Sequence, residues 1–527
     1  MKKTIFLTLL LIANMAYSQQ TINVIPYPQE VKYTGTNFAV LGFKLTVDKK
    51  LTESKNYAQV LVKTWNKRAS SFSNSVSNEL PISLTLDESI NNGTEAYSLS
   101  ITETSIRIRS ASSRGCFYAM QTLNQLVVFK GDEISLPQLE INDYPNYRWR
   151  SFMLDESRYF FGKEFVLRLL DELAALKINK FHWHLTDDQG WRIEIKKYPE
   201  LTRKGAWRKD SQIGGWKSEL RSGNAHGGFY TQKEIKEIID YAQVRNIDII
   251  PEIEMPGHSS AAIAAYPWLG VIGELTEVPV VFGKHKDSYN ISDPRVIDFL
   301  HNVLDEVCEL FPSEIIHIGG DEVLFGAWSE SGKMQAYLKQ QNLVSPADGQ
   351  IYFTNSISDY LAKKGKRMMG WNEILGQNIH GFDNSTDYQT KTSLSKKTII
   401  HFWRGDIKLI TEAAQKGYEI VNSISSSTYL DYKYNAIPLK KMYDFNPIPE
   451  GLEKKYQGKI IGVGCQMWTE WTPTYKDVEY QTFPRIAAMA EVAWSGKREY
   501  SDFVNRLREL GKDWKNSGIN FPLEEIK

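Results

Sequence analysis

Residues 315–322 read Ile-Ile-His-Ile-Gly-Gly-Asp-Glu, a short apolar run followed by two glycines and two adjacent acids. Short apolar runs of this kind recur along the chain, each closed by polar or aromatic residues and followed by a helical stretch. The eight runs cover residues 149–154, 180–185, 247–253, 315–318, 367–370, 398–402, 419–424 and 460–466. Strands that are buried on both faces and alternate with helices form a parallel sheet, and eight such units close a (β/α)8 barrel.

A smaller unit precedes the barrel. Short alternating stretches at 97–101 and 105–108 lead into a helical run at 115–129, a pattern typical of an α+β domain. The turn Asp143-Tyr144-Pro145 marks its end. We therefore predict an α/β fold in which a (β/α)8 TIM barrel is preceded by a small α+β domain. The predicted limits are 19–143 for the first domain, 144–499 for the barrel and 500–527 for an amphipathic C-terminal helix and tail.

The chain begins with a candidate export signal at residues 1–18. Lys2 and Lys3 precede an apolar run at 5–13, and a small-x-small site follows at 16–18. The apolar run is much shorter than the roughly 20 residues that span a bilayer. We therefore predict a cleaved signal peptide and an exported protein, located in the periplasm, at the cell surface or in the medium.

Composition narrows the class of partner. Lys plus Arg and Asp plus Glu both number 63, so the charge balance gives no reason to expect nucleic acid or an anionic membrane. An uncharged substrate fits better. Cys116, Cys308 and Cys465 are odd in number and widely spaced, which argues against a disulfide framework or a clustered metal site. We predict neither a metal nor a cofactor.

The predicted barrel indicates which residues are candidates for catalysis. Reactive residues of such barrels follow the C-terminal ends of the strands. Here these positions hold Asp155, Arg158, Asp187, Glu254, His258, Asp321, Glu322, Trp371, Glu373, Trp403, Tyr429, Asp431, Trp468 and Glu470. A cleft lined with acids and Trp is typical of a sugar site.

The adjacent acids Asp321 and Glu322 suggest acid catalysis. Two neighbouring, partly desolvated carboxyls repel each other, so we expect one of them to have a raised pKa and to act as general acid. The two preceding glycines are expected to let a ligand approach the backbone closely.

Several motifs in the barrel resemble glycoside hydrolase family 20, the β-N-acetylhexosaminidases. In chain order they read Leu-Asp-Glu-Ser-Arg at 154–158, His-Trp-His-Leu-Thr-Asp-Asp-Gln-Gly-Trp-Arg at 182–192, Pro-Glu-Ile-Glu-Met-Pro-Gly-His at 251–258, His-Ile-Gly-Gly-Asp-Glu at 317–322, Gly-Trp-Asn-Glu at 370–373 and Gln-Met-Trp-Thr-Glu at 466–470. The N-terminal region is similar to the non-catalytic domain that precedes such barrels.

The resemblance implies an exo-acting enzyme that removes terminal non-reducing β-linked GlcNAc or GalNAc from a glycan. The implied reaction is retaining and uses the substrate's acetamide as nucleophile instead of an enzyme group. Glu322 would act as general acid and then as base. Asp321 would accept a hydrogen bond from the acetamide N–H while an oxazolinium ion forms, and Tyr429 would steady the acetamide oxygen.

The resemblance also implies substrate-binding and supporting residues. Arg158 would bind two ring hydroxyls through its planar guanidinium, and Asp187 with His258 would form a supporting pair that tunes the general acid. The remaining sugar contacts would come from Asp431 and Glu470 for hydroxyls and from Trp371, Trp403 and Trp468 for the walls of the pocket.

Three other functions compete with this interpretation. A metal-dependent hydrolase could use His182, His184 and Asp187, although histidines packed inside the barrel are favoured. An ordinary retaining glycosidase would need a second carboxylate about 5 Å from Glu322. A sugar-binding protein without catalysis is the third.

Other properties stay open at this stage. Loops such as 206–228 and 377–397 are expected to build the leaving-group side of the cleft. The sequence leaves the natural glycan, the choice between GlcNAc and GalNAc, and the oligomeric state open.

Overall fold

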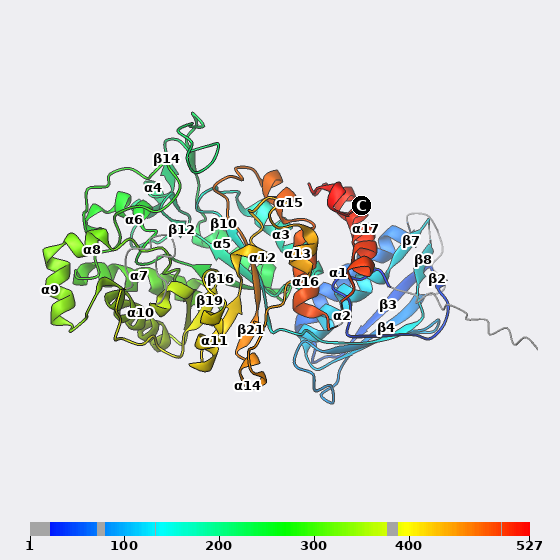
Figure 1. The fold of residues 1–527 in the computed structure, drawn as a ribbon. Coiled ribbons are helices and arrows are strands. Elements are labelled where there is room, and N and C mark those ends of the chain that lie inside the picture. Colours follow the sequence, from blue (N-terminus) through cyan, green and yellow to red (C-terminus); the bar gives the residue numbers. More distant parts are fainter. Residues whose placement is uncertain (1–21, 71–78, 132, 377–387, 497, 527) are drawn as a thin grey trace, which may run out of the picture.

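The computed structural model describes residues 22–70, 79–131, 133–376, 388–496 and 498–526 (Figure 1). The predicted signal peptide at 1–18 lies outside these residues. Within the described parts of the chain, no helix combines the length and the apolar character needed to cross a bilayer.

The N-terminal domain is an α+β unit, as predicted. Its main sheet has six strands in the order β1-β9-β5-β6-β4-β3, and the helices α1 and α2 pack on it (Figure 1). The bounds are β1 Glu30–Tyr33, β3 Gly42–Val47, α1 Thr52–Ser70, β4 Glu79–Leu86, β5 Tyr97–Ile101, β6 Ile106–Ser110, α2 Ser113–Leu126 and β9 Leu139–Asp143. A smaller sheet is formed by β2 Phe38–Val40, β8 Glu133–Leu136 and β7 Val128–Lys130.

The predicted barrel is confirmed. Eight strands pair in parallel around a closed ring, and the last strand returns to the first. In ring order they are β10 Trp149–Asp155, β11 Lys180–His184, β16 Asp248–Glu252, β17 Ile315–His317, β18 Arg367–Trp371, β19 Ile399–Phe402, β20 Glu419–Asn422 and β21 Ile460–Met467. All eight runs identified in the sequence are therefore strands.

Helices follow most of the strands and cover the barrel from outside (Figure 1). The main ones are α3 Lys163–Ala175, α5 Gln232–Gln243, α7 Pro294–Leu310, α10 Pro346–Lys363, α11 Lys408–Gln415 and α16 Arg485–Trp494. Three of them begin at a residue whose side chain caps the helix: Thr231 in α5, where Glu234 completes a capping box, Asp293 in α7 and Ser345 in α10.

After β18 the described residues do not contain the predicted helical stretch, part of which lies outside them. There the described residues contain only the short 3-10 helix η2 (Asn372–Leu375), which ends at Gly376 with a left-handed φ of 73°. Residues 388–398 are rich in Ser, Thr and Lys and lack the apolar periodicity that would bury one helix face. Between β20 and β21 only short helices occur, α12 Ser425–Thr428, α13 Leu439–Tyr443 and α14 Lys454–Gln457.

Strand register places charged residues side by side at the mouth of the barrel. Asp155 pairs with His184, His184 with Glu252, and Glu252 with His317 on four consecutive strands. Residues in register on parallel strands point to the same face. The register therefore brings two acids and two histidines into one row.

A buried ion pair joins the two domains. Lys177, just after α3, places its Nζ 2.9 Å from Asp143 Oδ2 at the end of β9, and both side chains are fully buried. Trp494 of the barrel domain donates its indole N–H to the other oxygen of Asp143.

The predicted C-terminal helix is present as α17 (Tyr500–Asn516). Its Trp514 donates the indole N–H to Glu172 of α3 and so holds the helix against the barrel domain.

Lys177→Met should therefore destabilise the protein strongly, because it leaves the buried Asp143 carboxylate without its cation. We expect the free energy of unfolding to fall by about 3–5 kcal/mol, measured by chemical denaturation. Lys32→Met is the control and should have little effect, because Lys32 and Glu140 form an ion pair of 3.9 Å on the exposed surface of the N-terminal domain. Equal effects of the two substitutions would contradict this account.

Candidate active site

A cleft of about 930 Å³ opens at the C-terminal ends of the barrel strands. Nine of the predicted site residues line it: Arg158, His258, Asp321, Glu322, Trp403, Tyr429, Asp431, Trp468 and Glu470. They come from six different strand ends, so closure of the barrel brings them together.

Asp187 lies behind this lining and joins three cationic groups. Its Oδ2 is 2.8 Å from Arg158 Nη2 and 2.9 Å from His184 Nε2, while its Oδ1 is 3.2 Å from His258 Nδ1. Burial alone would raise the pKa of Asp187, but Arg158 and His258 hold it well below its ordinary value. Asp187 is thus a permanent carboxylate that orients both a cleft-lining arginine and a cleft-lining histidine, and the predicted Asp187–His258 pair is present.

Arg158 is fixed from several sides. Its Nη1 donates to Asp155 Oδ2 across 3.2 Å, its Nε donates to Gln189 Oε1 across 3.2 Å, and its guanidinium lies 5.1 Å from the ring centre of Trp468. Glu470 Oε1 is 3.9 Å from Nη2. Arg158 is therefore both a partner in a salt bridge and a wall of the cleft.

The row of histidines beneath the cleft is held by Glu252. His184 Nδ1 lies 2.6 Å from Glu252 Oε2, and His317 Nδ1 lies 2.8 Å from Oε1. Burial lowers the pKa of His184, but Glu252 and Asp187 outweigh it and raise the pKa to about 10. His182 Nε2 contacts Glu252 across 2.9 Å, whereas His184 reaches Asp187. Among the described residues, His182, His184 and Asp187 do not gather their ligand atoms in one place, although each of them does so with other partners: His182 with Glu252 and His317, His184 with Glu252 and Glu254, and Asp187 with Asp188 and His258.

The acidic pair is split between two environments. Asp321 is 7% exposed, and its Oδ1 is buried with no hydrogen-bond partner among the described residues. Glu322 faces the cleft from a backbone with φ 48°, a strained value for a residue other than glycine. His258 Nε2 lies 3.8 Å from Asp321 Oδ2 and 3.8 Å from Glu322 Oε2. One histidine therefore faces both acids.

The raised pKa predicted for one member of the pair falls on Asp321. Burial raises the pKa of Asp321 to about 7, His258 opposes this, and Glu322 adds to it. The sequence predicts a raised pKa for the acid that donates the proton, a role that the resemblance gives to Glu322. Asp321 has a raised pKa without that role, because desolvation is the largest cause of its shift.

The two glycines before the pair make room for the protein's own side chains. A Cβ on Gly319, whose φ is 64°, would lie 1.7 Å from Glu254 Oε2, and a Cβ on Gly320 would lie 2.5 Å from Ile374 Cγ2. The close approach of a ligand to this backbone stays a prediction.

Two further acids approach Asp321 and received no role from the sequence. Burial raises the pKa of Glu254 and of Glu373 well above the ordinary value, and Asp321 adds to both shifts. Trp403 donates its indole N–H to both oxygens of Glu373, at 3.0 and 2.9 Å. Their position at strand ends is visible in the sequence, but their electrostatic interaction with Asp321 depends on the fold.

The aromatic walls match the prediction with one exception. Trp403 and Trp468 line the cleft, and Trp403 stacks with Tyr429 at a centroid distance of 6.0 Å and an interplanar angle of 18°. Trp371 is 0% exposed and stacks on His401 at 4.2 Å. It lies beneath Trp468 and does not belong to the lining of the cleft.

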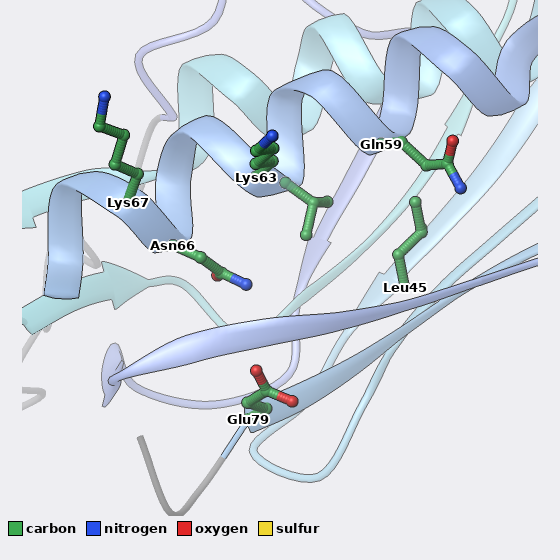
Figure 2. Close-up of a pocket in the computed structure, with 7 residues that line it drawn as sticks. Leu45, Gln59, Lys63, Asn66, Lys67 and Glu79 are labelled. Atoms are coloured by element: carbon green, nitrogen blue, oxygen red, sulfur yellow. The ribbon is translucent and has the colours of Figure 1, made fainter. Parts of the chain in front are cut away.

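A second hollow of about 520 Å³ lies in the N-terminal domain between α1 and the strands β3 and β4 (Figure 2). It is lined by Lys63, Asn66 and Lys67 of α1 and by Leu45 and Glu79 of the strands (Figure 2). The Asn66 amide bonds the backbone of Phe43. This surface brings together no acid pair and no aromatic wall, so the barrel cleft is the candidate active site.

Comparison with known proteins identifies the family. The model of the glycosyl hydrolase family 20 catalytic domain matches residues 147–497, and the model of domain 2 of the same family matches residues 21–144. The chain belongs to glycosyl hydrolase family 20.

Several relatives of this family cover most of the chain. A β-hexosaminidase of Porphyromonas gingivalis is 34% identical over 96% of this chain, which spans 65% of that protein's length. The exo-β-N-acetylglucosaminidase of Vibrio harveyi, solved with N-acetylglucosamine, has a TM-score of 0.80 and 32% identity over 95% of this chain and 78% of that one. The β-N-acetylhexosaminidase of Bacteroides fragilis has a TM-score of 0.78 and 29% identity, and the match covers 95% of this chain and 97% of that one.

His258→Asn should raise the pKa of Asp321. The cationic histidine holds this pKa down, so its removal leaves Asp321 protonated to a higher pH. The measurement is a pH titration of the carboxyl band by infrared difference spectroscopy, with Asp321→Asn to assign the band. His301→Asn on α7 is the control and should change nothing. An unchanged or lowered pKa in the His258 variant would show that the histidine does not act on this acid.

Proposed function

We propose that this protein is a β-N-acetylhexosaminidase that removes terminal non-reducing GlcNAc or GalNAc from glycans, with retention and with the substrate's acetamide as nucleophile. The observation that carries the proposal is Asp321 Oδ1, a buried acceptor without a partner among the described residues, beside a second acid that faces the cleft. A buried acceptor is costly unless a donor meets it. The acetamide N–H of the substrate is such a donor.

The first step uses both acids. Asp321 accepts the acetamide N–H and directs the acetamide oxygen to C1, where a C–O bond forms as the glycosidic bond breaks. Glu322 gives its proton to the leaving oxygen. The resulting oxazolinium ion is stabilised by the Asp321 carboxylate.

In the second step Glu322 acts as a base instead of an acid. As a carboxylate it takes a proton from water, which attacks C1 and opens the oxazolinium ring. Two displacements at C1 return the original β configuration. Tyr429, which lines the cleft, would hold the acetamide oxygen in place.

The pKa of about 7 for Asp321 fits this mechanism. Desolvation makes the carboxylate unfavourable, and a hydrogen bond from the substrate N–H, followed by positive charge on the oxazolinium ring, favours it. Asp321 is therefore stabilised as a carboxylate most strongly when the intermediate forms.

An enzyme nucleophile is less well supported. Glu254 and Glu373 are the nearby acids, and both have a pKa raised well above the ordinary value by burial. A protonated carboxyl is a poor nucleophile, which favours the acetamide instead.

We assign sugar binding to the other residues that line the cleft. Arg158 and Glu470 would bind ring hydroxyls from one side, and Asp431, whose buried Oδ1 also lacks a partner among the described residues, would accept another hydroxyl. Trp403 and Trp468 would enclose the ring. The same proposal assigns catalysis to residues 144–499, supporting roles to 19–143 and 500–527, and export to the signal at 1–18.

Glu322→Gln should abolish most activity on an aryl β-N-acetylglucosaminide. Loss of the proton donor and base should lower kcat by about 100-fold or more, while the thermal midpoint stays close to that of the wild type. The matched control is Glu330→Gln, an exposed residue at the end of helix α8 (Gly326–Glu330), which should keep full activity. Turnover near the wild-type rate in the Glu322 variant would refute its role.

Asp321→Asn tests the use of the acetamide. The amide cannot stabilise the oxazolinium charge, so kcat should fall by about 10²–10³-fold, and a thiazoline mimic of the intermediate should bind more weakly. The wild type should not cleave the matching glycoside that carries a 2-hydroxyl in place of the acetamide. Efficient cleavage of that glycoside, or unchanged thiazoline inhibition in the variant, would argue for an enzyme nucleophile.

A further inference from the structure

The wall of the cleft next to Glu322 is built by two segments outside the motifs. Trp216 belongs to the loop between β14 (Trp207–Arg208) and β15 (His226–Gly227), whereas Gly283 and Lys284 precede α7. All three line the same cavity as Glu322, and Lys284 Nζ lies 3.7 Å from Glu322 Oε1. Because Glu322 meets the leaving oxygen, this wall faces the departing part of the substrate.

A buried glutamine holds the two segments together. Gln212, 2% exposed, donates its Nε2 to the carbonyl of Ser218 across 2.9 Å and to the carbonyl of Trp216 across 3.4 Å. Its Oε1 accepts from Phe282 N across 3.0 Å, and its backbone N–H donates to Val280 O across 2.8 Å. The turn that carries Trp216 and the segment that carries Lys284 are therefore one unit.

The Trp216 indole is fixed but left uncovered. Its ring centre lies 5.2 Å from that of Trp471 with the planes at 86°, and a Cβ on Gly283 would lie 3.9 Å from its Cζ3. Trp216 is nevertheless 61% exposed. An indole that the fold positions at a cleft without covering it offers an apolar face to a ligand.

We propose that Trp216 and Lys284 form a leaving-group subsite for a second sugar. This rests on the function proposed above. The pyranose ring would lie against the indole of Trp216, and the Lys284 ammonium would donate to oxygen substituents of the same ring. The substrate class is then an oligosaccharide in which the terminal N-acetylhexosamine is linked to another sugar rather than to an alkyl alcohol.

The test compares two glycosides that differ in the leaving group alone, the β-1,4-linked disaccharide of N-acetylglucosamine and methyl β-N-acetylglucosaminide. Trp216→Ala should lower kcat/KM for the disaccharide about 5- to 10-fold, the loss of one aromatic contact, and leave the value for the methyl glycoside nearly unchanged. Trp216→Phe should restore most of the disaccharide activity. Leu220→Ala, 64% exposed in the same loop and outside the lining of the cleft, should behave as the wild type on both.

The outcomes separate the subsite from the proposed function. Equal losses on both glycosides, or no loss on the disaccharide, would overturn the subsite while the hydrolase stands. A wild-type protein that cleaves neither glycoside would overturn the proposed function and the subsite with it.

Discussion

The site depends on one buried carboxylate that three cationic side chains share. Asp187 contacts Arg158, His184 and His258, and the three come from the ends of β10, β11 and β16. A buried carboxylate is tolerated only when it is paired and hydrogen-bonded. This requirement fixes Arg158 in the wall of the cleft and His258 beside the acidic pair. A displacement of Asp187 would therefore disturb together the residues proposed to bind the sugar and those proposed to act on it.

The neighbouring acids Asp321 and Glu322 show how environment separates two chemically similar groups. Asp321 is buried and interacts electrostatically with Glu254 and Glu373, whereas Glu322 lies 3.7 Å from Lys284 at the cleft. Desolvation raises the pKa of Asp321, and the role proposed for Glu322 requires access to the leaving group. The proposed mechanism needs this division, because one acid must stay beneath the acetamide while the other exchanges protons with the leaving group and with water.

Much of this arrangement could be predicted from the sequence, because a parallel barrel turns positions along the chain into positions around a ring. The eight strands, and the meeting of Arg158, Tyr429 and Glu470, follow from that rule. The rule does not predict how deep a side chain lies below the mouth of the barrel. Trp371 was expected in the wall and is buried.

The sequence predicts that the loop 206–228 borders the cleft, and Trp216 of this loop lines it, but the sequence singles out neither Trp216 nor Lys284. Hydrogen bonds of Gln212 connect the two segments that carry these residues, which are far apart in sequence. A single polar side chain in a loop carries no periodic signal, so only the folded chain shows what it joins. The same holds for Glu254, whose carboxylate occupies the space beside Gly319.

The most direct test of the account is a crystal structure of the protein with a bound thiazoline, which mimics the cyclised acetamide. The account predicts that the ring nitrogen lies about 2.7–3.2 Å from Asp321 Oδ1 and that Glu322 lies within reach of the position of the leaving oxygen. A complex in which the fused ring points away from Asp321, with another carboxylate beneath C1, would contradict it.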